Sequence, residues 1–305
     1  MNRILLFDIM KALCVIEIVA FWHMFDYTSI NADDVMFGGD LTSVVLAAFT
    51  FSSGFFLGKK QVDIGTFYKT RLKRFMLPLL VSLMVFCLFG IISLKTMLLS
   101  TIGLSCFIPP MAPTLWFFSM IILCYLFTPF FLYGIGQMNN TDRVVNILIR
   151  CFFVYAVFIL LGVDERIQHY FLFYTLGMIT DMECIKSISN VNGCYKWGGV
   201  IIWLLCSLMD VPVLITDCIG IFILIFISGY IEEKANEKSK LLLCKISYAS
   251  MFAYLFHRQF YQIAKRLFAT PNETIPYWGI AITVILIFIF SYYGQKIYDK
   301  IVAKL

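Results

Sequence analysis

The chain has 305 residues, of which 61% are hydrophobic, 17% aromatic and 14% charged. This composition excludes an ordinary soluble domain, in which about 25% of residues are charged, because one apolar run of membrane-spanning length follows another. The net charge of +5 therefore reflects how cations are distributed across a membrane and does not indicate nucleic-acid binding. We predict an all-α, polytopic helical bundle that forms a single transmembrane domain over residues 1–305.

Apolar length predicts ten transmembrane helices, and eight to ten is the range that the sequence supports. They are expected at residues 5–25, 40–58, 75–94, 114–135, 146–163, 170–185, 197–210, 211–231, 246–264 and 275–295. The boundary between the seventh and the eighth rests on Asp210 and Pro212. The first segment lacks a small-residue cleavage site, so we expect it to remain in the fold.

The cations predict the orientation of these helices, because cytoplasmic loops carry an excess of Lys and Arg. Placing the amino terminus in the cytoplasm puts most basic residues on the cytoplasmic side. The exceptions are Lys95, Arg166, Arg258, Lys265 and Arg266. Both termini are then cytoplasmic, and the acidic segment 26–40 lies outside.

The first segment, Leu5 to Phe25, carries four ionisable residues in an otherwise apolar run: Asp8, Lys11, Glu17 and His23. Such residues are costly in hydrocarbon and usually face a bundle interior or a wet cavity, so we expect this helix to line a reaction site. Asp8 and Lys11 are three residues apart and can pair, although Lys11 can also extend to the headgroups. Glu17 either pairs with a cation from another helix or stays protonated.

Lys11 and His23 do not share a face of a regular helix. Twelve residues separate them by about 18 Å along the axis and turn their side chains about 120° apart. They share a face only if one extra residue is absorbed, for example in a π-bulge, which is often found at functional sites. If Lys11 and His23 share a face, the helix between these two residues should contain an i→i+5 hydrogen bond; a regular helix would remove Lys11 from the site.

All three histidines, His23, His169 and His257, fall at the outer ends of predicted spans. Histidine is well suited to moving a proton near neutral pH, so a bundle that gathers two or three of them gains a general base. The alternative is that each is an interfacial residue satisfied by a neighbour. We favour that alternative for His169, beside Arg166 and Gln168, and favour a functional role for His23; for His257 both interpretations stay open.

A cationic segment, residues 59–74, follows the second predicted span. Arg71 and Arg74 are three residues apart, so a helical start would place both guanidinium groups on one face, with Lys69 and Lys73 nearby. Arg binds phosphate oxygens in a bidentate manner, which suits a multiply phosphorylated ligand. Topology alone also demands cations in this inner loop.

The ten cysteines are scattered and show no CxxC or Cys/His spacing. Buried Cys usually behaves as a small apolar residue. We therefore predict neither disulfides nor a metal site.

Six stretches, in this order, resemble the membrane-bound acyltransferase 3 family, which includes bacterial polysaccharide O-acetyltransferases. They are FDIMKALCVIEIVAFWH, FTFSSGFFL, FYKTRLKRFMLPLL, LWFFSMIILCYLFTP, HYFLFYTLGM and ISYASMFAYLFHRQF. The resemblance covers nearly the whole chain. In one respect the sequence departs from the family pattern: the family usually has ten residues between a basic residue and the His, whereas Lys11 and His23 enclose eleven.

The resemblance implies an acyl-CoA donor, acetyl-CoA above all, bound from the cytoplasm near Arg71 and Arg74, with no metal. It implies acyl transfer to a hydroxyl of a cell-surface glycan or its lipid-linked precursor, in the inner membrane of a bacterium. The resemblance then implies His23 as the catalytic residue, as a general base or as a covalent carrier of the acyl group. Ser53 and Gly54 are expected to allow close helix packing.

Two other functions are compatible with the sequence. A proton-coupled transporter or flippase would use Asp8, Glu17 and His23 as a proton relay, but the spans show no clear two-half repeat of the kind that many transporters carry. A member of the family that has lost its activity is the other alternative, for which the spacing of Lys11 and His23 is the only indication.

Overall fold

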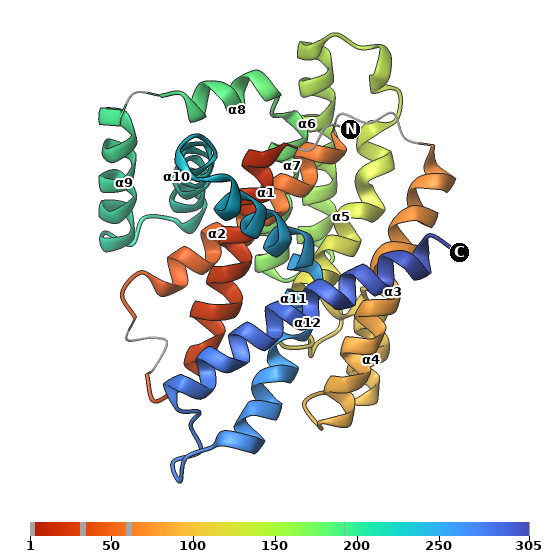
Figure 1. The fold of residues 1–305 in the computed structure, drawn as a ribbon. Coiled ribbons are helices and arrows are strands. Elements are labelled where there is room, and N and C mark those ends of the chain that lie inside the picture. Colours follow the sequence, from red (N-terminus) through yellow and green to blue (C-terminus); the bar gives the residue numbers. More distant parts are fainter. Residues whose placement is uncertain (1–3, 31–34, 59–62, 192, 305) are drawn as a thin grey trace. The chain divides into compact units, whose positions relative to one another are not determined.

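The computed structural model describes residues 4–30, 35–58, 63–191 and 193–304. Within these ranges the chain forms helices and no strands, so the all-α prediction is confirmed (Figure 1). Three of the cations used to predict the orientation, Arg3, Lys59 and Lys60, lie outside the described residues.

Helices follow one another along almost the whole chain. The long ones are α1 (Leu5–Ile16), α2 (Gly38–Leu57), α3 (Ile64–Leu88), α5 (Trp116–Leu132), α6 (Asn140–Leu160), α7 (Glu165–Ile179), α9 (Gly193–Leu208), α10 (Val213–Lys234), α11 (Glu237–Phe268) and α12 (Tyr277–Val302). Each overlaps one predicted span. The two short helices α4 (Leu94–Thr101) and α8 (Met182–Ser189) were not predicted.

Among the described residues, four helices, α2, α6, α10 and α12, are long and apolar enough to cross a membrane, and α5 and α9 are shorter apolar helices. The number of spans and the orientation of the termini therefore remain predictions. The predicted break between the seventh and eighth spans is confirmed. Asp210 adopts a positive φ of 51°, which Asp tolerates in turns, and Pro212 is the N-cap of α10.

Two predicted boundaries are wrong. The sixth predicted span, 170–185, combines the end of α7 with α8, because the chain leaves the helical conformation at Thr180. The third helix begins at Ile64 and not near residue 75. Its N-cap is Asp63, whose side chain accepts a hydrogen bond from the Thr66 N–H at 2.9 Å, and such a cap stabilises a helix start. Residues 69–74 therefore belong to a helix and not to a loop.

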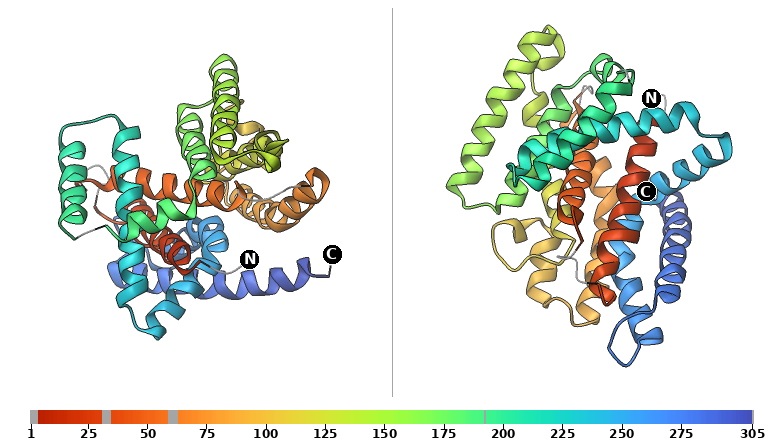
Figure 2. Two further views of the ribbon diagram at one scale, coloured as in Figure 1. Left: turned by 90° about the horizontal axis from the view of Figure 1, so that it is seen from above. Right: turned by 90° about the vertical axis from the view of Figure 1, so that its left-hand side faces the viewer.

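The described helices form two compact units, Met1–Phe49 with Met182–Leu305, and Thr50–Asp181. In the first unit α11 packs along both α12 and α1, and α1 also contacts α10 (Figures 1 and 2). Val15, Val19 and Ile287 are fully buried in the apolar core of this unit. The hydroxyl of Tyr261 donates to the Val19 carbonyl at 2.7 Å, which joins α11 to the continuation of α1.

In the second unit α2 and α7 approach at two glycines. A Cβ at Gly54 would collide with the Tyr174 carbonyl, and a Cβ at Gly177 would collide with the Phe51 carbonyl. Small residues allow such backbone contact in membrane helices, so the packing role expected of Gly54 is confirmed. The Arg143 guanidinium donates to the Gly58 and Met178 carbonyls, both at 2.9 Å.

We predict that Gly54→Ala destabilises the protein by about 1–3 kcal/mol, because the added methyl group forces two helix backbones apart. Gly39→Ala in the same helix is the matched control, since a Cβ there meets nothing within 4 Å. Ala is also the better helix former, so the control should be neutral or slightly stabilising. Thermal unfolding in detergent measures both variants; equal melting temperatures would contradict the close-packing role.

Candidate active site

The first helix changes its winding in the middle of the predicted segment. It is α-helical to Ile16, π-helical over Glu17–Phe21 and 3₁₀-helical over Trp22–Tyr27. The Trp22 N–H bonds to the Glu17 carbonyl, which is the predicted i→i+5 hydrogen bond. A π turn absorbs one residue, so about 100° of rotation is removed and Lys11 and His23 come within about 20° of one face.

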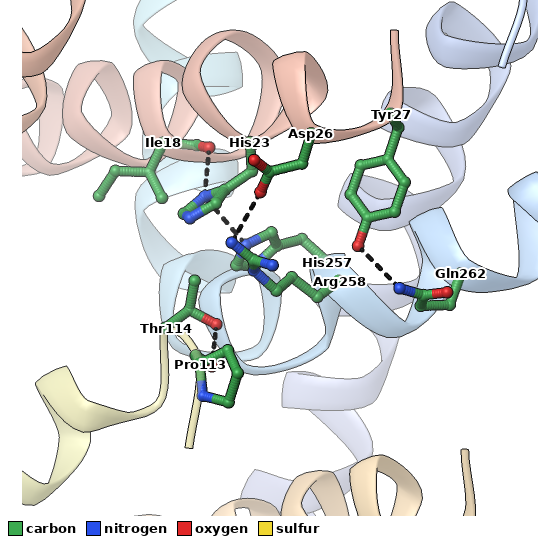
Figure 3. A network of polar contacts seen from close by, with 9 residues as sticks. All are labelled: Ile18, His23, Asp26, Tyr27, Pro113, Thr114, His257, Arg258 and Gln262. Atoms are coloured by element: carbon green, nitrogen blue, oxygen red, sulfur yellow. Dashed lines mark hydrogen bonds and ion pairs between the residues drawn. The ribbon is translucent and has the colours of Figure 1, made fainter. Parts of the chain in front are cut away.

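His23 lies in the 3₁₀ segment that follows the π turn, and its side chain is buried, with 6% of the residue exposed. Its Nδ1 is 2.9 Å from the Ile18 carbonyl oxygen, within the same turn. It is also 3.2 Å from Nε2 of His257, which α11 contributes (Figure 3). The structure therefore brings together two of the three histidines, which are 234 residues apart in the sequence.

The partners of the two rings determine where their protons lie. Nδ1 of His257 is 2.8 Å from the Tyr254 carbonyl and 3.2 Å from the Ala253 carbonyl. Carbonyls only accept, so this Nδ1 carries the proton and Nε2 of His257 is an acceptor. Nδ1 of His23 then faces two acceptors and must be protonated, which leaves Nε2 of His23 as the nitrogen that can take a proton.

His169 belongs to the second unit and has a different environment. Its ring makes edge contacts with Tyr170 and Phe173, at centroid distances of 5.0 and 5.2 Å. These contacts agree with the structural role favoured for His169 from the sequence.

The two acidic residues of the first segment each accept a hydrogen bond from a hydroxyl group. Asp8 accepts a hydrogen bond from Ser247 of α11 at 2.9 Å, and Glu17 accepts one from Thr42 of α2 at 3.0 Å. The second carboxylate oxygen of Glu17 is buried with no hydrogen-bond partner among the described residues. Of the two alternatives for Glu17, the neutral acid fits these surroundings, because a buried charge requires a charged or fully bonded partner.

The sequence did not single out the ion pair beside the two histidines. Nη2 of Arg258 is 2.8 Å from Oδ2 of Asp26, and the Tyr27 hydroxyl accepts from Gln262 at 3.3 Å (Figure 3). The pairing was missed because 232 residues separate Arg258 from Asp26. One signal was available: each of the two residues closely follows a histidine.

The cationic segment forms the second candidate site, at the start of α3. The Arg71 guanidinium lies over the rings of Tyr125 and Phe67, at 5.3 and 5.6 Å from their centroids. Arg74 is exposed, three residues later. Both arginines belong to α3, in which a spacing of three residues separates their positions by about 60° around the axis. Lys69 is exposed and Lys73 is half-buried. A shared ligand of Arg71 and Arg74 stays a prediction.

An open pocket of about 320 Å³ lies between α3, α5 and α6. Its walls include Tyr68, Phe130, Tyr133 and Arg150. The Tyr68 hydroxyl donates to the Leu126 carbonyl at 2.7 Å. Tyr68 and Leu126 follow, in sequence, Phe67 and Tyr125, whose rings the Arg71 guanidinium covers, so the pocket and the cationic segment share α3.

We predict that both His23 and His257 are neutral with the proton on Nδ1. Solid-state NMR of the protein with ¹⁵N-labelled histidine distinguishes the two tautomers, and His169→Gln removes the third signal. The opposite tautomer at His23, with the proton on Nε2, would contradict the assignment of Nε2 as the proton acceptor.

A family model described as an acyltransferase domain matches residues 4–294. The match covers both units and nearly the whole chain, including the histidine pair and the cationic face of α3. No curated protein and no solved structure matches the chain.

Proposed function

Because the chain belongs to the acyltransferase 3 family, and is therefore a membrane acyltransferase, we propose that it moves an acyl group from acyl-CoA to a hydroxyl group. Acetyl is the proposed acyl group, and the acceptor is a cell-surface glycan or its lipid-linked precursor. The proposed location is the inner membrane of a bacterium, with both termini in the cytoplasm. The single observation that carries the catalytic assignment is the buried histidine pair, His23 and His257.

In the proposed reaction His23 is the general base. Its Nε2 takes the proton of the acceptor hydroxyl as the hydroxyl oxygen attacks the thioester carbonyl carbon. The carbon–sulfur bond then breaks, and the CoA thiolate leaves and takes the proton back from the imidazolium. The products are the acyl ester and free CoA thiol, so His23 returns to its starting form.

The lone pair on Nε2 of His23 can instead attack the thioester carbonyl carbon, so that His23 carries the acyl group as an acyl-imidazole. Both mechanisms need an unprotonated Nε2 on His23, and the hydrogen bonds at Nδ1 support this. His257 does not need to touch the substrate in either mechanism. Its proposed role is to hold the His23 ring in the required tautomer and orientation, as an acceptor for the Nδ1 proton.

The proposed donor site lies on α3. CoA carries several phosphate groups and an adenine ring, and Arg71 and Arg74 offer two guanidinium groups on one face. Lys69 and Lys73 add charge to the same segment. The adjoining pocket, with Tyr68 in its wall, supplies an aromatic surface on which the adenine ring can stack.

We predict that His23→Ala lowers the rate of acyl transfer by about 10²–10⁴-fold, the usual contribution of a general base, with unchanged protein level in the membrane. His257→Leu should lower kcat because one of the two acceptors for the His23 Nδ1 proton is lost, and His257→Gln should recover part of it. His169→Gln is the control and should be fully active. Retained activity in His23→Ala would refute the catalytic assignment.

We predict that Arg71→Ala/Arg74→Ala weakens binding of acetyl-CoA to the purified protein, measured by calorimetry at several salt concentrations. The matched control is Arg166→Ala, since Arg166 is also stacked on a ring, that of Trp116 at 4.8 Å, but lies outside the cationic face. Unchanged affinity for acetyl-CoA in the double variant would mean that these cations serve only to orient the helices in the membrane. If the wild type binds no acetyl-CoA, proton-coupled flux in liposomes becomes the experiment to run.

A further inference from the structure

The 3₁₀ segment Trp22–Tyr27 places two functional groups on one face. A 3₁₀ helix has three residues per turn, so side chains at positions i and i+3 eclipse each other about 6 Å apart along the axis. His23 and Asp26 are such a pair. In a regular α-helix they would diverge by about 60°, so the 3₁₀ winding is what aligns them.

The partner helix α11 presents two neighbouring residues to this face. His257 contacts His23, and Arg258 contacts Asp26 (Figure 3). Both contacts join the 3₁₀ segment Trp22–Tyr27 to α11, and they lie next to each other. The Arg258 guanidinium is therefore held about one 3₁₀ turn from the His23 ring.

Arg258 keeps donors available after it has bound Asp26. Its side chain is 23% exposed and that of Asp26 is 45% exposed. The contact with Asp26 occupies one guanidinium nitrogen, Nη2, and the Arg258 side chain also bonds to the Tyr27 hydroxyl. Nε is buried without a hydrogen-bond partner among the described residues. A buried charged donor without an acceptor is costly, which indicates that an acceptor arrives when the site is occupied.

We propose that Arg258, fixed by Asp26, stabilises the oxyanion that forms on the acyl carbonyl during transfer. The inference rests on the proposed acyltransferase function and adds a catalytic residue to it. When the acceptor oxygen bonds to the carbonyl carbon, the C=O π pair moves onto the carbonyl oxygen. The negative charge that develops there lies beside His23 and is matched by the fixed positive charge of Arg258. When the pair returns, the CoA thiolate is expelled.

The arrangement favours the acyl carbonyl over an anionic group of the acceptor as the partner of Arg258. The guanidinium is anchored next to the base, and the base must lie within hydrogen-bond reach of the attacking oxygen. The carbonyl oxygen is bonded to the carbon under attack, so it lies close to the same nitrogen. An anionic acceptor group has no fixed distance from the reacting hydroxyl.

The test is the release of CoA thiol from acetyl-CoA by the purified full-length protein with water as the only acceptor. Arg258→Gln should lower kcat by about 10²–10³-fold, as removal of one oxyanion donor does, with an unchanged KM for acetyl-CoA. Arg258→Lys keeps the charge but loses the planar fork, so its kcat should fall at least about tenfold. Lys265→Gln is the matched control and should be fully active, because Lys265 also lies on α11 and forms an exposed ion pair with Glu273, which follows the end of that helix.

Wild-type rates of thiol release in Arg258→Gln would overturn the inference and leave the proposed function intact. A raised acceptor KM during transfer, with normal hydrolysis, would also overturn it, since Arg258 would then bind an anionic acceptor. If Arg258→Gln does not fold, Arg258→Lys is the test of the inference. A kcat of Arg258→Lys within twofold of the wild type then overturns it. If the wild type releases no thiol and transfers no acyl group, the proposed function itself fails.

Discussion

The hydrogen bond from the Trp22 N–H to the Glu17 carbonyl is the constraint on which the candidate active site depends. This bond closes a π turn, which is wider than an α-helical turn, directly after the regular α-helix that ends at Ile16. Without that turn, the side chains of Lys11 and His23 would diverge by about 120°. The wide turn also leaves the Ile18 carbonyl within reach of the His23 ring, 2.9 Å away. One extra residue therefore positions the His23 ring and supplies its first hydrogen bond.

The second half of the site follows from the packing of α11 against this helix. Tyr261 bonds to the Val19 carbonyl inside the π turn, one helical turn beyond His257. The apolar core around Val19 is fully buried, so α11 has little freedom to rotate or slide. His257 is thereby held with its Nε2 toward His23. A rigid apolar contact thus determines the tautomer of a polar group, which is the way packed cores preorganise catalytic side chains.

Part of this site could be predicted from the sequence, because the angle between two positions on one helix depends only on the number of residues between them. A count of residues showed that Lys11 and His23 share a face only if the helix absorbs one extra residue, and the structure has a π turn between them. The start of α3 was misplaced because apolar length marks where a helix enters a membrane, whereas its N-cap, Asp63, marks where the helix begins. The partner of His23 could not be chosen from the sequence, since the contact with His257 depends on tertiary packing.

The carboxyl groups of the first segment show why this helix tolerates its polar residues. Asp8 and Glu17 each accept a hydrogen bond from a hydroxyl of another helix, Ser247 and Thr42. A transporter relay would need these acids to exchange protons along a continuous path. Hydroxyl partners on two different helices instead tie each acid to a separate neighbour, which stabilises a fixed framework. The two acids then hold the helix in place, and the proposed proton transfer is assigned to His23, which follows the π turn.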